Sequence, residues 1–157
     1  MVKAQGIYST TTAAAGNVHV SSDGTLYRST SSARYKTDIE TIEDAYSDAL
    51  LQCRPVWYRS TCAGDNPEHG WWGFIAEEVA EIDSRLVFWK TRETTTDIDG
   101  STTTEELAEP IAEGVQYDRF VPHLLNLIKR QKEQLDTQTA AIASLEARLT
   151  ALEGGAN

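Results

Sequence analysis

The sequence predicts an α+β fold, in which a small mixed domain follows a β-hairpin and precedes a long C-terminal helix. Three stretches of the 157 residues lead to this prediction. Residues 17–29 alternate apolar and polar side chains around an Asp-Gly pair, which is typical of a hairpin. Residues 31–120 combine a helical apolar stripe with short apolar runs. Residues 121–152 repeat a seven-residue pattern, which predicts a coiled-coil helix.

Composition and charge exclude several classes of protein. Hydrophobic residues make up 40% of the chain and charged residues 24%, so a packed core is possible. No run of eighteen apolar residues is present, and we expect no membrane-spanning helix. The chain carries 14 basic and 24 acidic residues, a net charge of -10. That balance argues against nucleic acid as a partner, because a polyphosphate backbone attracts basic surfaces.

The predicted hairpin follows a small, polar stretch of the chain. Val18 and Val20 alternate with polar neighbours, and Asp23-Gly24 supplies the turn. An isolated two-stranded hairpin is only marginally stable in water. We therefore expect residues 1–30 to be the end of a larger β-rich structure that lies upstream.

The middle of the chain predicts one longer helix, a short helix and several short strands. An apolar stripe predicts a helix over residues 38–53, which Pro55 ends. Residues 91–106 are rich in threonine and are expected to form a hairpin tip or a loop. The short helix is expected near residues 75–82, and the short strands are expected at 56–58, from 71, at 86–89 and at 115–117.

The C-terminal segment has the clearest periodicity. As a helix, residues 121–152 would span roughly 48 Å, more than the domain needs for its own packing. Two series offset by three positions form the a and d positions of a heptad repeat. A single helix packed on its own domain is the alternative, and the number of associating helices does not follow from the heptads. The a series is Val121, Ile128, Leu135, Ile142 and Leu149, and the d series is Leu124, Gln131, Gln138, Leu145 and Leu152.

The two cysteines do not indicate a metal site. Cys53 and Cys62 are nine positions apart, and His69 follows after seven more. Zinc fingers usually bring paired ligands within two to four residues of each other. We expect no metal and no cofactor, and we interpret the cysteines as small packing residues of a reducing compartment. A disulfide between them remains open.

Short motifs along the chain resemble those of one family. LYRST at residues 26–30 precedes SSARYKTDI at 31–39, in which serine, any two residues, arginine, any residue and lysine form the most specific pattern. GFIAEEV follows at 73–79, Val115-Gln116-Tyr117 comes later, and a long helix ends the sequence. In this combination the chain resembles the peptidase S74 domain, the intramolecular chaperone at the C-terminus of phage tail spikes, tail fibres and neck appendages.

The resemblance implies a chaperone that cleaves itself. Family members form trimers, guide the folding of the upstream fibre, and then cut themselves off before the motif serine. On this sequence the cleaved bond is Thr30–Ser31, with Ser31 as the nucleophile and Lys36 as the general base. Arg34 and Glu78 match positions that would support the site.

The resemblance also implies the partners of the chain, its location in the virion and its division into parts. The partners would be two further copies of the chain and the upstream fibre segment. The protein would be a virion tail precursor, assembled in the host cytoplasm, that releases its chaperone fragment after cleavage. The implied parts are an upstream fibre or spike end at 1–30, an auto-cleaving chaperone domain at 31–120, a parallel trimeric coiled coil at 121–152 and a flexible tail at 153–157.

The chemistry of the predicted pair has its own requirements. A serine hydroxyl is a poor nucleophile until a base removes its proton, and a lysine serves as that base only when its pKa falls well below about 10.4. Burial or the neighbouring charge of Arg34 would lower it. Ser32 stands where many relatives carry aspartate, so it offers no negative charge to a nearby cation. The alternative is that Ser31 caps a helix and Lys36 is solvated.

Two other functions remain open at this point. The first is a non-cleaving trimeric tip or receptor-binding cap of a viral fibre. The second is a membrane-tethered transcription factor of the myelin regulatory type, which carries the same auto-cleaving domain between a DNA-binding domain and a transmembrane helix. The sequence in hand contains neither of those flanking parts.

Overall fold

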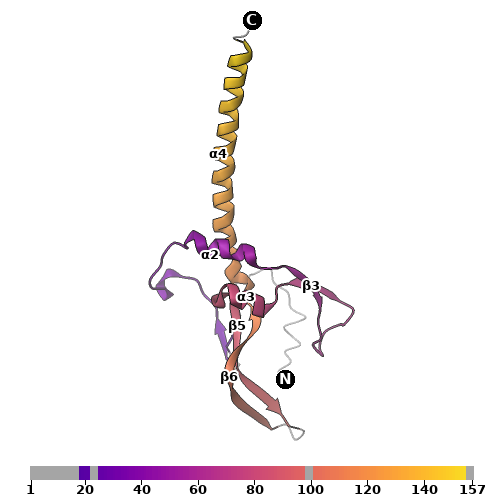
Figure 1. Ribbon diagram of the computed structural model, residues 1–157. Helices are drawn as coiled ribbons and strands as arrows, with labels where there is room; N and C mark the ends of the chain where they lie inside the picture. Colours follow the sequence, from indigo (N-terminus) through magenta and orange to yellow (C-terminus); the bar gives the residue numbers. More distant parts are fainter. Residues whose placement is uncertain (1–17, 22–24, 98–100, 155–157) are drawn as a thin grey trace, which may run out of the picture. The chain divides into compact units, whose positions relative to one another are not determined.

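The computed structural model describes residues 18–21, 25–97 and 101–154. Contacts between residues divide the chain into two compact units, Met1–Glu40 and Thr41–Asn157. The first unit contains a small hairpin and the motif segment. The second contains two further antiparallel hairpins, short helices and a long C-terminal helix, so the chain mixes helices and strands as the sequence predicts (Figure 1).

The first unit begins with the predicted hairpin. β1 (Val18–Val20) and β2 (Leu26–Arg28) pair antiparallel, with Val18 opposite Arg28 and Val20 opposite Leu26. The prediction of paired strands is confirmed, and the predicted Asp23-Gly24 turn lies outside the described residues. Every residue of both strands is exposed. A single 3-10 turn, η1 (Ala33–Tyr35), follows.

The helix predicted over residues 38–53 is shorter than expected. α2 spans Asp44–Ala49 and continues as the 3-10 helix η2 (Leu50–Gln52), which ends before Pro55 as predicted. The first six residues of the prediction were wrong. Asp38 has a φ of 51°, in the left-handed region that a right-handed helix excludes. The apolar stripe there stabilises no helix because Ile39 is exposed rather than packed.

The second unit contains a short hairpin rich in aromatic residues. β3 (Val56–Arg59) pairs antiparallel with β4 (Gly70–Gly73), and Trp57 lies opposite Trp72. Both predicted strands are present. A Cβ at Gly70 would collide with the indole of Trp57, so any larger residue there would displace this ring.

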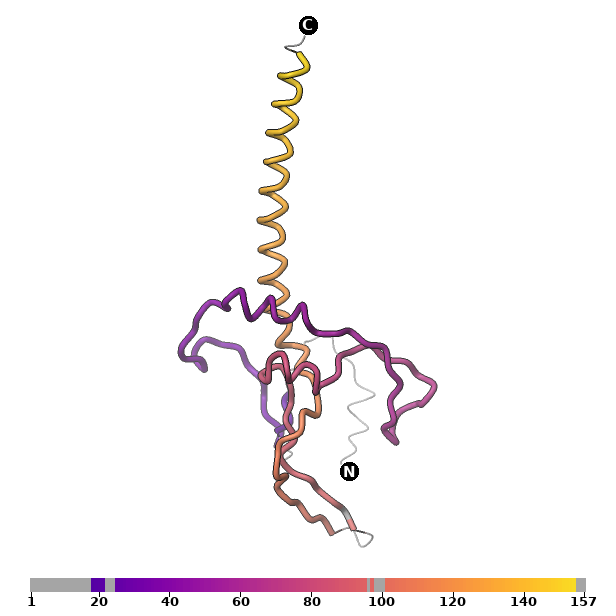
Figure 2. Tube along the Cα trace, in the orientation of Figure 1, coloured from indigo at the N-terminus to yellow at the C-terminus, as the bar shows by residue number. Residues whose placement is uncertain are grey.

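A second, longer hairpin follows α3 (Ala76–Ile82) and the 3-10 helix η3 (Ser84–Leu86). β5 (Val87–Thr96) pairs antiparallel with β6 (Thr102–Val115), and Figure 2 traces the two strands as one long ribbon. The short helix was predicted correctly. The strand predicted at 86–89 begins one residue later and continues much further than expected.

The threonine-rich stretch forms the far end of the β5–β6 hairpin, as the hairpin-tip alternative of the prediction indicated, and not a loop. Most of residues 91–106 belongs to β5 and β6, because β-branched side chains suit strands and the two strands satisfy each other's backbone groups. The hydroxyls of Thr94 and Thr104 lie 3.0 Å apart across the ribbon. The predicted strand at 115–117 is the end of β6, and Tyr117 lies instead in the 3-10 helix η4 (Tyr117–Arg119).

The core of the second unit is small and is formed by residues of η2, α3, η3, β5, β6 and the start of the C-terminal helix. Val79 is 1% exposed, and Leu86 and Val87 are each 2% exposed. Phe74 stacks on Phe120, with 5.3 Å between the ring centroids. The buried hydrophobic residues of the described chain are Leu50, Val79, Leu86, Val87, Ala112 and Phe120.

The long helix α4 (Phe120–Gly154) is anchored at its beginning and extends well past α2 (Figure 1). Asn126 donates a hydrogen bond of 3.2 Å to Asp44, and Arg130 forms an ion pair with Asp48. From residue 131 to residue 154 every side chain is exposed. Within the described ranges, no helix combines the length and the apolar surface that crossing a membrane requires.

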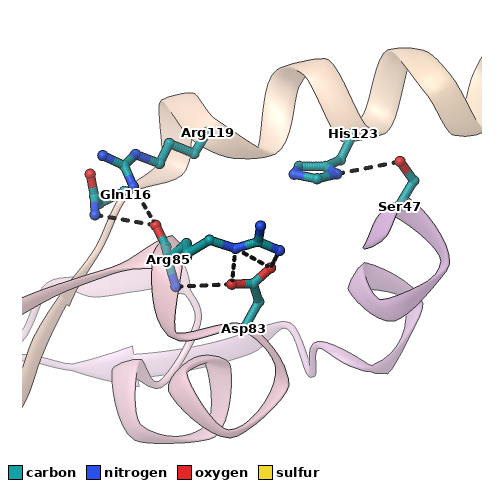
Figure 3. Close-up of polar contacts among 6 residues, drawn as sticks. All are labelled: Ser47, Asp83, Arg85, Gln116, Arg119 and His123. Carbon is teal, nitrogen blue, oxygen red and sulfur yellow. Dashed lines mark hydrogen bonds and ion pairs between the residues drawn. The ribbon is translucent and has the colours of Figure 1, made fainter. Parts of the chain in front are cut away.

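Polar contacts tie η3 to the start of α4, as Figure 3 shows. Arg85 donates hydrogen bonds to the carboxylate of Asp83, with Nε 2.9 Å from Oδ1. Gln116 donates to the carbonyl of Val87 at 2.7 Å, and Arg119 donates to the carbonyl of Arg85 at 2.6 Å. These bonds satisfy backbone groups beside the core and position the first turn of α4.

Candidate functional site

The motif serine and lysine lie together because the chain turns between them. Ser32 is extended, residues 33–35 form the 3-10 turn, and Lys36 is extended again, with its amide donating to the carbonyl of Ala33 at 3.0 Å. This turn brings the lysine back beside the serine. Lys36 Nζ donates a hydrogen bond to Ser31 Oγ at 2.8 Å. The structure therefore brings together the two residues that the motif spacing singled out.

Arg34 and Ser32 form the second contact of this turn. Arg34 Nε donates to Ser32 Oγ at 3.2 Å, and the guanidinium lies 5.8 Å from the ring centroid of Tyr35. Ser32 therefore accepts a hydrogen bond from the neighbouring cation, although it carries no charge. The backbone amide of Ser32 lies 3.5 Å from Thr30 Oγ1, next to the predicted cleavage point.

The geometry permits one reaction in particular. A hydroxyl within hydrogen-bond distance of an amine is the arrangement that general-base activation requires. Ser31 directly follows Thr30 in the chain. Attack of its hydroxyl on the carbonyl carbon of the Thr30–Ser31 peptide bond therefore needs only a suitable bend of the backbone. Both Ser31 and Lys36 are exposed in the single chain, whereas a lysine base functions where water is excluded.

Glu78 is held by a residue that the sequence did not single out. Arg54 Nε donates to its carboxylate at 3.1 Å, and a guanidinium nitrogen makes a second bond to the other oxygen. This bidentate contact raises the pKa of Arg54. It joins the start of α3 to the segment that leads into β3. Arg54 belongs to no periodic pattern, so no signal in the sequence paired it with Glu78.

Ser47 and His123 form a second contact that the sequence did not indicate. Ser47 is completely buried, and its Oγ lies 3.3 Å from Nδ1 of His123 (Figure 3). Sequence reasoning assigned no role to His123. The position of Ser47 one helical turn before Leu50 was an available sign that its side chain faces the core.

The described residues offer few other places for chemistry. Burial raises the pKa of the Cys53 thiol, and neither Cys53 nor Cys62 forms a disulfide. Across the described ranges, no group of three or more histidine, cysteine, aspartate or glutamate side chains is placed to hold a metal ion. Tyr117 is among the residues that line a pocket of about 300 Å³, and its hydroxyl accepts a hydrogen bond from the amide of Phe74 at 3.1 Å.

Comparison with known proteins supports the motif assignment. A search of curated proteins found no match. The model of the peptidase S74 family, described as chaperone of endosialidase, matches residues 31–88. The match begins at Ser31 and includes the SSARYKTDI and GFIAEEV motifs. Residues 31–88 are therefore similar to the peptidase S74 family of endosialidase chaperones, and the resemblance that the motifs predicted is confirmed over this segment.

Proposed function

We propose that this chain is the C-terminal intramolecular chaperone of a phage tail fibre or spike. It assembles as a trimer, guides the folding of the fibre that precedes it, and releases itself by cutting the Thr30–Ser31 bond. The observation that carries the proposal is the 2.8 Å hydrogen bond between Lys36 and Ser31, at the first residue of the segment that matches the family. The fibre left behind is a component of the virion tail.

The cleavage follows from this contact. Lys36 in its neutral form accepts the proton of the Ser31 hydroxyl, and Oγ attacks the carbonyl carbon of Thr30. The C–N bond between the two residues breaks, and the Ser31 amine takes the proton from Lys36. Water then hydrolyses the ester that joins the Thr30 carbonyl to Ser31 Oγ. The products are a Thr30 carboxylate and a new chain that begins with a free Ser31 amino group.

Exposure of the pair supports a site that assembly completes. In the single chain, water reaches both Ser31 and Lys36. A solvated ammonium group does not release its proton readily, so the lysine requires cover. Neighbouring chains supply that cover in the trimer, and cleavage starts only after assembly. Release of the chaperone then traps the assembled fibre kinetically, because the element that nucleated it has gone.

The way α4 packs supports association through the heptad seam. Its polar contacts with α2 come from His123, Asn126 and Arg130, which occupy c, f and c positions of the heptad. That face is opposite the a/d seam. On the seam, Val121 is 62% exposed and Ile128 is 60% exposed, even beside the domain. The domain thus uses the outer face of α4, and the apolar seam is left for other copies of the helix.

The surface of α4 also contains a hole of the kind that coiled coils use. Gln131, Gln134, Leu135 and Gln138 surround a groove of about 340 Å³. They occupy d, g, a and d positions, and in a parallel coiled coil four such residues receive one a-position side chain of the neighbouring helix. In such an assembly Leu135 of a neighbouring copy would lie at the level of this hole along the helix.

Cleavage is tested by the intact mass of the purified protein over days. A species that begins at Ser31 should form without added protease. Ser31→Ala should abolish it because the nucleophile is lost, and Lys36→Ala should slow it by orders of magnitude because the base is lost. Ser32→Ala is the matched control: its hydroxyl contacts Arg34 and not Lys36, so cleavage should continue.

Two outcomes would contradict the proposed cleavage. Wild-type protein that stays intact for days would leave the non-cleaving trimeric tip as the better function. Cleavage that continues in Ser31→Ala at the wild-type rate would show that another group is the nucleophile.

Assembly is tested by truncation after Arg130. This end point removes the fully exposed part of α4 but keeps the ion pair between Arg130 and Asp48, so the domain itself stays intact. The truncated chain should be largely monomeric in sedimentation and should cut itself slowly across a dilution series. A truncated monomer that cleaves as fast as the full chain would show that one chain completes the site and that α4 serves folding alone.

A further inference from the structure

A hydrogen bond closes a short turn around the Thr30–Ser31 peptide bond. The backbone amide of Ser32 donates to Thr30 Oγ1 at 3.5 Å. Threonine hydroxyls that accept the amide two positions later form local turns of this kind. The ring runs from Oγ1 through the carbonyl carbon of Thr30 and the backbone of Ser31 to the Ser32 amide. The peptide bond between Thr30 and Ser31 is therefore one of the bonds of this ring.

The turn restrains a torsion angle on which the proposed cleavage depends. Attack of Ser31 Oγ on the carbonyl carbon of Thr30 closes a five-membered ring, so it requires suitable values of both φ and χ1 at Ser31. The hydrogen bond from Lys36 Nζ at 2.8 Å holds Oγ in place and thereby restrains χ1. The turn contains the N–Cα bond of Ser31, so the bond from the Ser32 amide to Thr30 restrains φ.

We propose that Thr30 is a positioning residue for the self-cleavage, and that efficient cutting requires a side-chain hydroxyl on the residue before the cut bond. This inference rests on the self-cleavage proposed above. The Thr30 hydroxyl takes no part in the bond changes and acts through the Ser32 amide on the backbone of Ser31. Holding a nucleophile near its attack geometry lowers the barrier, because less conformational freedom is lost when the reaction occurs.

The expected effect is modest because a single hydrogen bond is involved. That bond is long in the single chain, where Thr30 is exposed to water. Hydrogen bonds in catalytic sites often tighten as the reacting geometry forms. Loss of the Thr30 hydroxyl should therefore slow cleavage roughly three- to tenfold, far less than loss of the nucleophile or the base.

The test measures the rate of self-cleavage of the full chain by intact mass. Thr30→Val replaces the hydroxyl by a methyl group and keeps the branched shape, so cleavage should slow roughly three- to tenfold. Thr30→Ser keeps the hydroxyl and loses the methyl group, so cleavage should stay close to the wild-type rate. Ser29→Ala is the matched control, because its hydroxyl lies outside the turn. Sedimentation should show the same assembly for all of these variants.

Two further measurements separate positioning from a general change in structure. In Thr30→Val the plateau of the pH–rate profile should fall, while the pH of the half-maximal rate stays the same because Lys36 is still the base. Ser32→Pro removes the amide donor, and the φ of -65° that Ser32 adopts suits proline. In a Ser32→Pro background, Thr30→Val should cause no further slowing, because the hydrogen bond is already absent.

Three outcomes would overturn the positioning role of Thr30. They are cleavage of Thr30→Val at the wild-type rate, cleavage of Thr30→Ser as slow as that of Thr30→Val, and equal slowing by Thr30→Val with and without Ser32→Pro. Each would leave the proposed self-cleavage intact, since the wild-type chain still cuts itself. A wild-type chain that stays uncut would overturn the self-cleavage and this inference with it.

Discussion

Replacement of Leu86 by alanine tests the core that positions the second unit. The Leu86 side chain is 2% exposed and shares the core with Val79, Val87 and Phe120. Full burial of a leucine side chain contributes about 1.5–3 kcal/mol. The neighbours are themselves buried and held by strand and helix backbone, so the cavity closes only in part. The expected loss is therefore about 3–5 kcal/mol, out of a total stability of about 5–15 kcal/mol.

Urea unfolding followed by tryptophan fluorescence measures this loss, since the chain has four tryptophans. The midpoint should fall while the slope of the free energy with urea stays the same. Leu51→Ala is the matched control: the same atoms are removed from a side chain that is 72% exposed, and the change should stay within about 0.5 kcal/mol. A loss below about 1 kcal/mol for Leu86→Ala, or equal losses for the two variants, would refute the reasoning.

Two further predictions concern the polar contacts around the start of α4. The hydrogen bonds from Arg85 hold the pKa of Asp83 below its usual value. The Asp83 carboxylate therefore stabilises the fold above about pH 4. This contribution is lost as the pH falls through the lowered pKa. Asp83→Asn should cost about 1 kcal/mol at pH 7 and should flatten the acid dependence of the unfolding free energy; an unchanged acid dependence would rule out this role. Ser47→Ala should cost about 1 kcal/mol through the lost bond to His123. A double-mutant cycle with His123→Ala measures the coupling directly, and strictly additive effects would show that the contact contributes nothing.

Elements whose pattern repeats within one segment could be predicted from the sequence. The bounds expected for the coiled-coil helix, 121–152, lie inside α4 (Phe120–Gly154), and the helix expected near 75–82 is α3 (Ala76–Ile82). Their defining residues are neighbours along the chain, so the period is visible whatever the element packs against. The helix expected from residue 38 failed at its first six positions because a periodic stripe forms a helix only where a surface covers it.

For the candidate site, the spacing of the motif named Ser31 and Lys36, but their contact comes from the 3-10 turn between them, which brings Nζ to 2.8 Å from Oγ. Glu78 was named from the motif, and its partner Arg54 lies 24 positions away along the chain. Ser47 and His123 are 76 positions apart, and neither was assigned a role. Such contacts depend on which surfaces of distant segments meet when the core forms. A repeating pattern records which face of a segment is apolar, but it contains no information about the residue that this face will meet.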